Sequence, residues 1–134
     1  MNSKPSLEKL RNDLAKLKNF DVVVYGSYCT SDFHKRSDID VAVITRKTTP
    51  VTNRKIWSRL VGQAPDTYDI KLFELLPLEI KISIAKNNLV IFGDKLDISE
   101  YFYHFRKLWV DAAHRYYENQ FTSFREKIKA LAHI

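Results

Sequence analysis

The stretch VVVYGSYCTSDFHKRSDIDVAVI, residues 22–44, decides how the rest of the chain is interpreted. It opens with β-branched, apolar residues, which predict a strand over residues 20–26 that is buried on both faces. The strand ends at Gly26-Ser27, a polar segment follows, and Asp38-Ile39-Asp40 then begins a second apolar strand that runs to Thr45. We therefore expect polar groups to gather where the first strand ends and the second begins.

The residues at this junction suit a phosphate and a metal ion. Gly26 has no Cβ, so its backbone can approach a phosphate closely, and Ser27 offers a hydroxyl and an N–H at the expected start of a short helix. Asp38 and Asp40 stand two residues apart on a strand, so both carboxylates project from the same face. Two carboxylates at that spacing repel each other unless a cation lies between them, and Mg²⁺ bridges carboxylates to phosphates.

A third carboxylate is Asp69, in the segment YDIKLFELL that predicts a strand over residues 68–76. If this strand pairs beside the second one, Asp69 lies alongside Asp38 and Asp40. Alternation then places Asp69, Lys71 and Phe73 on one face. We favour Lys71 as a solvated surface lysine, with a phosphate contact as the alternative. Three acids that face one phosphate-binding turn predict two-metal phosphoryl or nucleotidyl transfer.

The remaining patterns predict helices and one more strand. Leucines three and four residues apart predict a helix over residues 6–18, and proline-initiated helices are expected from Pro50 and over residues 77–86. Residues 89–92 predict a short strand. A long helix is expected from Asp97 to about residue 131, with Asp97 and Glu100 at capping-box spacing. The fold class is therefore α/β (α+β): a small mixed sheet of about four strands flanked by helices, with a nucleotide-handling domain over 1–96 and a helical tail over 97–134.

Composition limits the setting of the protein. Lys and Arg number 22 against 16 Asp and Glu, and this net charge of +6 attracts anions. Cys29 is the only cysteine, which excludes an internal disulfide and favours a reducing, cytoplasmic location. No apolar run approaches the roughly 18 residues that a membrane span needs, and the N-terminus shows no apolar leader region.

The tail is rich in aromatic residues, with nine between residues 101 and 124. Such a concentration exceeds what one helix needs to cover a small sheet, so we expect an interface, either a homodimer or a contact with a partner's helix. Basic residues accompany the aromatic ones, and RNA binding by base stacking is the weaker alternative. Truncation after Gly93 is expected to impair assembly rather than nucleotide binding.

The G-S pair, the S-D-x-D motif at residues 37–40 and the later Asp69 together resemble the DNA polymerase β-like nucleotidyltransferase superfamily. In length the chain is similar to the minimal nucleotidyltransferase (MNT) branch, which often forms a toxin–antitoxin pair with a HEPN-domain ribonuclease. The resemblance implies the nucleotidyltransferase fold, ATP as substrate and two Mg²⁺ ions. Members often carry a basic, glycine-containing segment after the G-S, whereas this chain has Tyr28-Cys29-Thr30-Ser31, and Lys35 and Arg36 are candidates to replace its phosphate contacts.

The resemblance assigns roles to the candidate residues. Asp38, Asp40 and Asp69 are the implied metal ligands and catalytic residues, with Asp69 as the base or the ligand that positions the nucleophile. The implied phosphate-binding residues are Gly26, Ser27, Arg36 and Ser37.

The implied reaction is Mg²⁺-dependent transfer of a nucleoside monophosphate, AMP from ATP, to a hydroxyl on a partner HEPN toxin. Two alternatives remain open. One is transfer to a small molecule such as an aminoglycoside. The other is a non-catalytic module that binds nucleotide or masks a partner.

Overall fold

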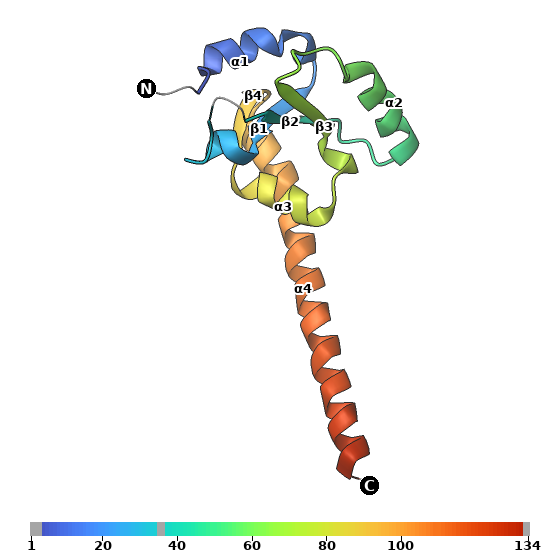
Figure 1. The fold of residues 1–134 in the computed structure, drawn as a ribbon. Helices are drawn as coiled ribbons and strands as arrows, with labels where there is room; N and C mark the ends of the chain where they lie inside the picture. Colours follow the sequence, from blue (N-terminus) through green and yellow to red (C-terminus); the bar gives the residue numbers. More distant parts are fainter. Residues whose placement is uncertain (1–3, 35–36, 133–134) are drawn as a thin grey trace.

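A four-stranded mixed sheet forms the centre of the head of the molecule in the computed structural model, which describes residues 4–34 and 37–132 (Figure 1). The strands are β1 (Asp21–Tyr25), β2 (Ile39–Ile44), β3 (Tyr68–Leu72) and β4 (Leu89–Phe92). Their order is β3-β2-β1-β4, with β2 and β4 antiparallel to β1 and β3 parallel to β2. The mixed sheet and its helical flanks are confirmed.

One face of the sheet is covered by the N-terminal segment. α1 (Leu7–Asp13) is followed by the 3₁₀ helix η1 (Ala15–Leu17), and Ser6 caps α1 by accepting a hydrogen bond from the backbone N–H of Lys9 at 3.2 Å. Leu10, Leu14 and Leu17 are fully buried in the cluster on this face, which also holds Val22, Val24 and Val41 from the strands. α2 (Pro50–Leu60) adds Leu60 to the same cluster beside the edge strand β3.

The other face is covered by α3 (Leu78–Lys86) and the first turns of α4 (Lys95–Ala132). Here Val23, Ala42 and Ile44 from the sheet pack with Ile84, Ile98 and Phe102. Beyond these turns α4 leaves the head and projects away from it (Figure 1). Because Ile98 and Phe102 are almost fully buried, the beginning of α4 is part of the core of the head.

The first helix and the third strand end earlier than expected. The first helix ends at Asp13, and its expected continuation is the 3₁₀ helix η1. The third strand ends at Leu72, because the 3₁₀ helix η3 (Phe73–Leu75) turns the chain toward α3 and buries Phe73.

The expected capping box at Asp97 and Glu100 is wrong. α4 begins earlier, at Lys95, and the Asp94 side chain accepts a hydrogen bond from the backbone N–H of Asp97 at 2.9 Å. The Asp97 carboxylate instead accepts a hydrogen bond from Nη2 of Arg46 at 2.9 Å.

A division of the chain at residue 96 stays a prediction. In the described part of the chain, none of the helices combines the length and apolar character that a bilayer span requires.

Candidate functional site

The register of the strands sets Asp40 at the centre of the candidate site. Asp40 pairs with Asp69 across the parallel β2–β3 ladder and with Tyr25 across the antiparallel β1–β2 ladder. Neighbouring strands lie about 4.8 Å apart, so Asp40 has one of these residues on each side. Asp38 immediately precedes β2 and is exposed, two residues before Asp40 and thus on the same face. The expected approach of Asp69 to Asp40 is confirmed.

Gly26 lies directly against the Asp40 carboxylate. It begins the 3₁₀ helix η2 (Gly26–Cys29) with a φ of 71°, a conformation that side chains rarely allow. A Cβ at this position would collide with Oδ2 of Asp40 and lie 3.4 Å from its Cγ. Glycine is therefore required both by the backbone conformation and by the neighbouring carboxylate, and the G-S turn and Asp40 form one continuous surface.

Ser27 and Ser37 lie in the two turns that border this surface. Ser27 is the second residue of η2, and its carbonyl accepts the backbone N–H of Thr30 at 3.0 Å. Ser37 holds the turn before Asp38, because its Oγ accepts the N–H of His34 at 3.2 Å and its N–H donates to the His34 carbonyl at 2.9 Å. The candidate phosphate ligand Arg36, with Lys35, lies outside the described residues.

Electrostatic repulsion is concentrated on Asp40. Burial raises the pKa of its carboxyl above the ordinary value, the negative charges of Asp69 and Asp38 raise it further, and Lys71 opposes them. Burial, followed by the charges of Asp40 and Asp69, also raises the pKa of the Tyr25 phenol to about 12. Ionised Asp40 is thus destabilised where it stands, and a cation bound beside it would relieve the repulsion.

Lys71 is nearer to the acids than a simple surface lysine. It shares the face of Asp69, as alternation along β3 predicts, and its Nζ lies 3.5 Å from Oδ2 of Asp69. Both side chains are about half exposed, so the pair contributes little to stability. Its importance is positional, because it places a positive charge at the rim of the carboxylate cluster.

The residues present fit Mg²⁺ that is shared with a nucleotide. Within residues 4–34 and 37–132, no group of three or more His, Cys, Asp or Glu side chains is close enough to hold a metal ion unaided. Mg²⁺ at nucleotide sites is bound by one or two carboxylates and takes its other oxygen ligands from phosphates and water. The paired Asp40 and Asp69, with Asp38 beside them, offer this donor set.

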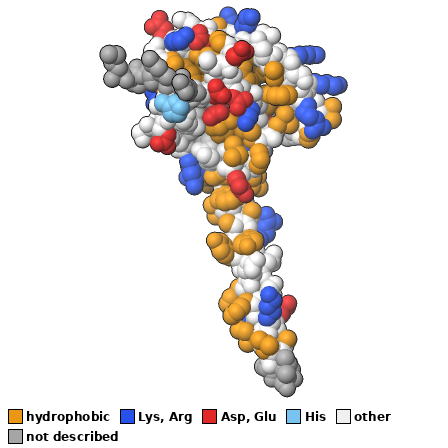
Figure 2. Space-filling model, in the orientation of Figure 1, with side chains coloured by type: hydrophobic (Ala, Val, Ile, Leu, Met, Phe, Trp, Pro, Cys, Tyr) orange, Lys and Arg blue, Asp and Glu red, His pale blue; other side chains and the backbone are white. Residues whose placement is uncertain are grey.

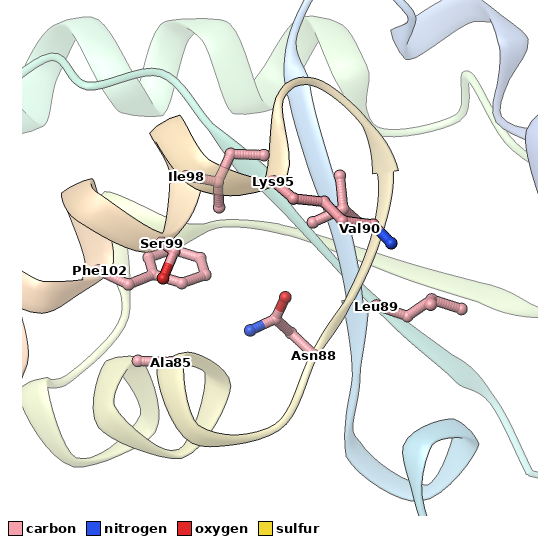
Figure 3. A pocket seen from close by; sticks show the side chains of 8 residues that line it. All are labelled: Ala85, Asn88, Leu89, Val90, Lys95, Ile98, Ser99 and Phe102. Atoms are coloured by element: carbon pink, nitrogen blue, oxygen red, sulfur yellow. The ribbon is translucent and has the colours of Figure 1, made fainter.

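The cavities near the sheet lie at different distances from the acids. A hollow of about 270 Å³ at the edge of β3 includes Asp69 in its lining, with Trp57 and Pro65 among its other walls. Trp57 is held there by a hydrogen bond from its Nε1 to the carbonyl of Ile70 at 2.9 Å. Figure 3 shows a second cavity, of about 240 Å³, between α3, β4 and the start of α4, with the Asn88 amide directed into it. None of the candidate site residues lines this second cavity.

The sequence did not point to Tyr25 as a neighbour of the acids, nor to the ion pair between Lys71 and Asp69. Tyr25 is the last residue of β1, and its place opposite Asp40 depends on the antiparallel register. Lys71 was detectable, since it follows Asp69 by two residues in a strand, but exposed lysines at such positions are common. Tyr28 is buried, with its hydroxyl donating to the carbonyl of Pro5 at 2.6 Å, and so serves packing.

The strand register, the glycine turn against Asp40 and the paired carboxylates are the features expected of a nucleotide-binding protein. The chain belongs to the nucleotidyltransferase domain family, whose model matches residues 7–128. It is therefore an enzyme of the nucleotidyltransferase class.

One relative is similar to the chain over most of its sequence. The chain is 47% identical over 111 residues to a protein of Methanocaldococcus jannaschii named "Putative protein adenylyltransferase", with 83% of this chain and 86% of the relative covered.

Solved structures share the fold. A toxin–antitoxin structure with AMP-PNP has a TM-score of 0.60 at 18% identity and covers 78% of this chain and 90% of that chain. A complex of a tri-AMPylated Shewanella oneidensis HEPN toxin with an MNT antitoxin has a TM-score of 0.58 at 14% identity. This match covers 82% of this chain and 92% of that chain. At these identities the likeness supports the fold alone.

Proposed function

We propose that the protein transfers AMP from ATP to a hydroxyl of a partner protein in a Mg²⁺-dependent reaction, and that the partner is a HEPN-domain toxin. The observation that carries the proposal is the register that sets Asp69 beside Asp40 while Gly26 lies against the same carboxylate. Support comes from the relative named as a protein adenylyltransferase and from the MNT–HEPN complex of the same fold, in which the toxin is tri-AMPylated.

The residues of the G-S turn would bind the triphosphate. Ser27 offers its hydroxyl, and the backbone N–H groups of η2 offer further donors beside it. Ser37 precedes the acids and would add a contact from its own turn, and Arg36, which precedes it in the sequence, stays a candidate phosphate ligand. Lys71 supplies a positive charge next to Asp69, where it would offset part of the charge that enters with the substrate.

Asp38, Asp40 and Asp69 would hold the Mg²⁺ ions together with the phosphates. When bound, the ions neutralise the triphosphate and make an acceptor hydroxyl more acidic. Asp69 lies at the open edge of the sheet, beside the hollow that Trp57 borders, and there it would orient the acceptor hydroxyl and take its proton. The acceptor oxygen forms a bond to the α-phosphorus as the bond to the β-phosphate oxygen breaks, and pyrophosphate leaves.

The test is label transfer from α-labelled ATP with Mg²⁺, with and without a HEPN-domain protein of the same organism. We expect label on the HEPN protein, and we expect Asp40→Asn to lower transfer by at least about 100-fold, because it removes the central carboxylate. The matched control is Asp111→Asn, the same chemical change on the exposed part of α4, which should transfer at the normal rate. Full transfer by Asp40→Asn would refute the site. Label on a small molecule or an RNA, with none on protein, would refute the partner.

A further inference from the structure

The apolar face of α4 that packs on the head ends near residue 109. Ile98, Phe102, Phe105 and Trp109 recur at steps of four and three, and this stripe covers the sheet and α3. Phe105 packs on Phe73 with the ring centroids 5.1 Å apart. The same helical positions continue as Ala112, Tyr116, Asn119 and Ser123, so beyond Trp109 the stripe keeps only one large side chain, that of Tyr116, which is 60% exposed. The head therefore accounts for only the first part of the helix.

A second stripe begins as the first one ends, on a different side of the helix. It alternates steps of four and three over three heptads, which is the spacing of a coiled-coil seam. Its apolar members are between 50% and 71% exposed, and Figure 2 shows hydrophobic side chains along the projecting helix. We name this stripe the seam; its residues are Val110, His114, Tyr117, Phe121, Phe124, Ile128 and Leu131.

We propose that the seam pairs with the seam of a second copy of this chain to form an antiparallel coiled coil. In the symmetric alignment, Phe121 lies against Phe124 of the second copy, Tyr117 against Ile128, and His114 against Leu131. The seam is thus complementary to itself when the two helices run in opposite directions. A two-fold axis between the central phenylalanines relates the copies.

The charges beside the seam favour this direction. Glu118 and Arg125 occupy the same flanking position in successive heptads, one residue after Tyr117 and Phe124. In the antiparallel alignment Glu118 lies beside Arg125 of the second copy, and the symmetry makes this pair twice. A parallel pair in register would set Arg125 beside Gln120, without an opposite charge. Flanking charges of this kind set partner choice and orientation in coiled coils.

The geometry leaves both heads and both candidate sites free. Residues 110–131 extend for about 32 Å along the helix. In the alignment above, Trp109 of the second copy lies beyond the end of this helix, so the heads stand at opposite ends of the coil. Six aromatic side chains and the aliphatic seam residues would bury on the order of 1,000 Å², at the low end of specific interfaces. We therefore expect a reversible dimer.

Sedimentation velocity of the full chain over a range of concentrations tests the association. We expect a monomer–dimer equilibrium, and we expect the double substitution Phe121→Glu and Phe124→Glu to yield monomer throughout. The matched control, Thr122→Glu with Ser123→Glu, changes charge equally between the seam positions and should dimerise more than ten times as tightly as the seam variant. A monomer at all concentrations, or a dimer that the seam substitutions leave intact, would overturn the proposal.

A charge exchange tests the direction of the helices. Glu118→Arg and Arg125→Glu each create two like-charge contacts, so each variant alone should dimerise about tenfold more weakly. A mixture of the two variants restores both opposite-charge pairs and should form heterodimers at nearly the original affinity. Glu126→Arg and Lys129→Glu are the controls with the same charge changes away from the seam. A mixture that associates no better than its components would overturn the antiparallel pairing.

These experiments measure self-association and involve no nucleotide. A negative result would therefore leave the proposed adenylyl transfer unaffected, and a failure of adenylyl transfer would leave the proposed dimer unaffected. A chain that stays monomeric but binds a HEPN protein or an RNA through the seam would refute the second copy as the occupant.

Discussion

At the scale of single residues, the site depends on the absence of a side chain as much as on the carboxylates. Gly26 leaves the space into which Oδ2 of Asp40 fits, and its positive φ turns the chain from β1 into η2. Asp40 in turn stands between Tyr25 and Asp69. A change at Gly26 would therefore move the carboxylate without altering its chemistry.

Gly26→Ala is expected to lower both stability and activity. The positive φ alone costs an alanine about 1–2 kcal/mol, and the Cβ must displace Asp40. A carboxylate displaced by about 1 Å should lower label transfer on the order of 100-fold. Gly62→Ala is the control, because Gly62 also has a positive φ, of 89°, but nothing lies within 4 Å of the added Cβ. Urea denaturation and label transfer should separate the two: an equal loss of activity in Gly62→Ala would refute the explanation.

A pH-dependent contribution to stability is expected from Tyr68 and Asp13. The Tyr68 hydroxyl donates to Oδ2 of Asp13 at 2.6 Å, and this hydrogen bond, helped by Lys9, lowers the pKa of the Asp13 carboxyl against the opposing effect of burial. A lowered pKa in the folded state means that the bond stabilises the protein above the ordinary value of 3.8 and ceases to do so as the pH falls through the lowered pKa.

Tyr68→Phe should therefore lower the free energy of unfolding by about 1 kcal/mol at neutral pH, a value already discounted for the partial exposure of Asp13. The difference from the unmodified chain should shrink when the pH falls below about 4. Thermal melts at several pH values measure it. Tyr103→Phe, at a tyrosine that is 62% exposed, should change stability by less than about 0.5 kcal/mol at every pH. A difference that is constant with pH would contradict the role of Asp13.

At the scale of elements, a polar joint fixes the start of α4 to the far end of the sheet. The Glu74 carboxylate accepts hydrogen bonds from the N–H of Thr45 at 3.1 Å, the N–H of Arg46 at 3.0 Å and the hydroxyl of Tyr101 at 2.8 Å. Arg46 donates through Nη2 to Asp21 at 3.0 Å and to Asp97 at 2.9 Å. The joint therefore connects η3 and α4 with the end of β2 and the start of β1.

The helix cap next to this joint, at Asp94, is testable. Asp94→Ala removes the side-chain acceptor at the start of α4 and should cost about 1 kcal/mol of stability in urea denaturation. Glu100→Ala, at the position expected from the sequence to complete a capping box, should cost less than about 0.5 kcal/mol. The opposite ranking would restore the capping box at Asp97 and Glu100.

At the scale of the whole molecule, the head and the projecting part of α4 are supported by different contacts. The core of the head includes Ile98 and Phe102, whereas the seam residues are exposed along the projecting helix (Figure 2). A cut at Gly93 would therefore remove part of the core together with the tail. A truncation that removes the projecting helix but keeps the core of the head must therefore come after Trp109.

A chain that ends at Ala112 should keep the fold of the head. At low protein concentration, where association contributes little, its free energy of unfolding should stay within about 1 kcal/mol, or roughly 5 °C in Tm, of the full chain. A chain that ends at Gly93 should lose cooperative unfolding, because it lacks Ile98 and Phe102. Circular dichroism melts of the three chains provide the measurement. A cooperative melt of the chain ending at Gly93 would contradict the role of α4 in the core.

The local elements followed from short-range patterns. The apolar strand before Gly26, the alternation after Asp38 and the proline-initiated helices are set by side-chain periodicity and backbone preferences within a few residues. The ends of elements were less predictable. The third strand ends at Leu72 because Phe73 is buried against α4. α4 begins at Lys95 because the Asp94 side chain caps it, whereas the Asp97 carboxylate accepts a hydrogen bond from Arg46. Both outcomes depend on residues distant in the sequence.

The sequence by itself determined the kind of chemistry and the class of fold, because Gly26, Asp38, Asp40 and the strand around Asp69 follow from residue type and local spacing. Only the tertiary structure decided that β3 lies parallel to β2 with Asp69 opposite Asp40, that Tyr25 and Lys71 border the acids, and that Gly26 is packed against Asp40. It also decided which face of α4 the head covers and which it leaves exposed. The reason is that strand pairing and helix docking join segments far apart in the chain, and the free energy that selects them comes from burial that local sequence does not specify.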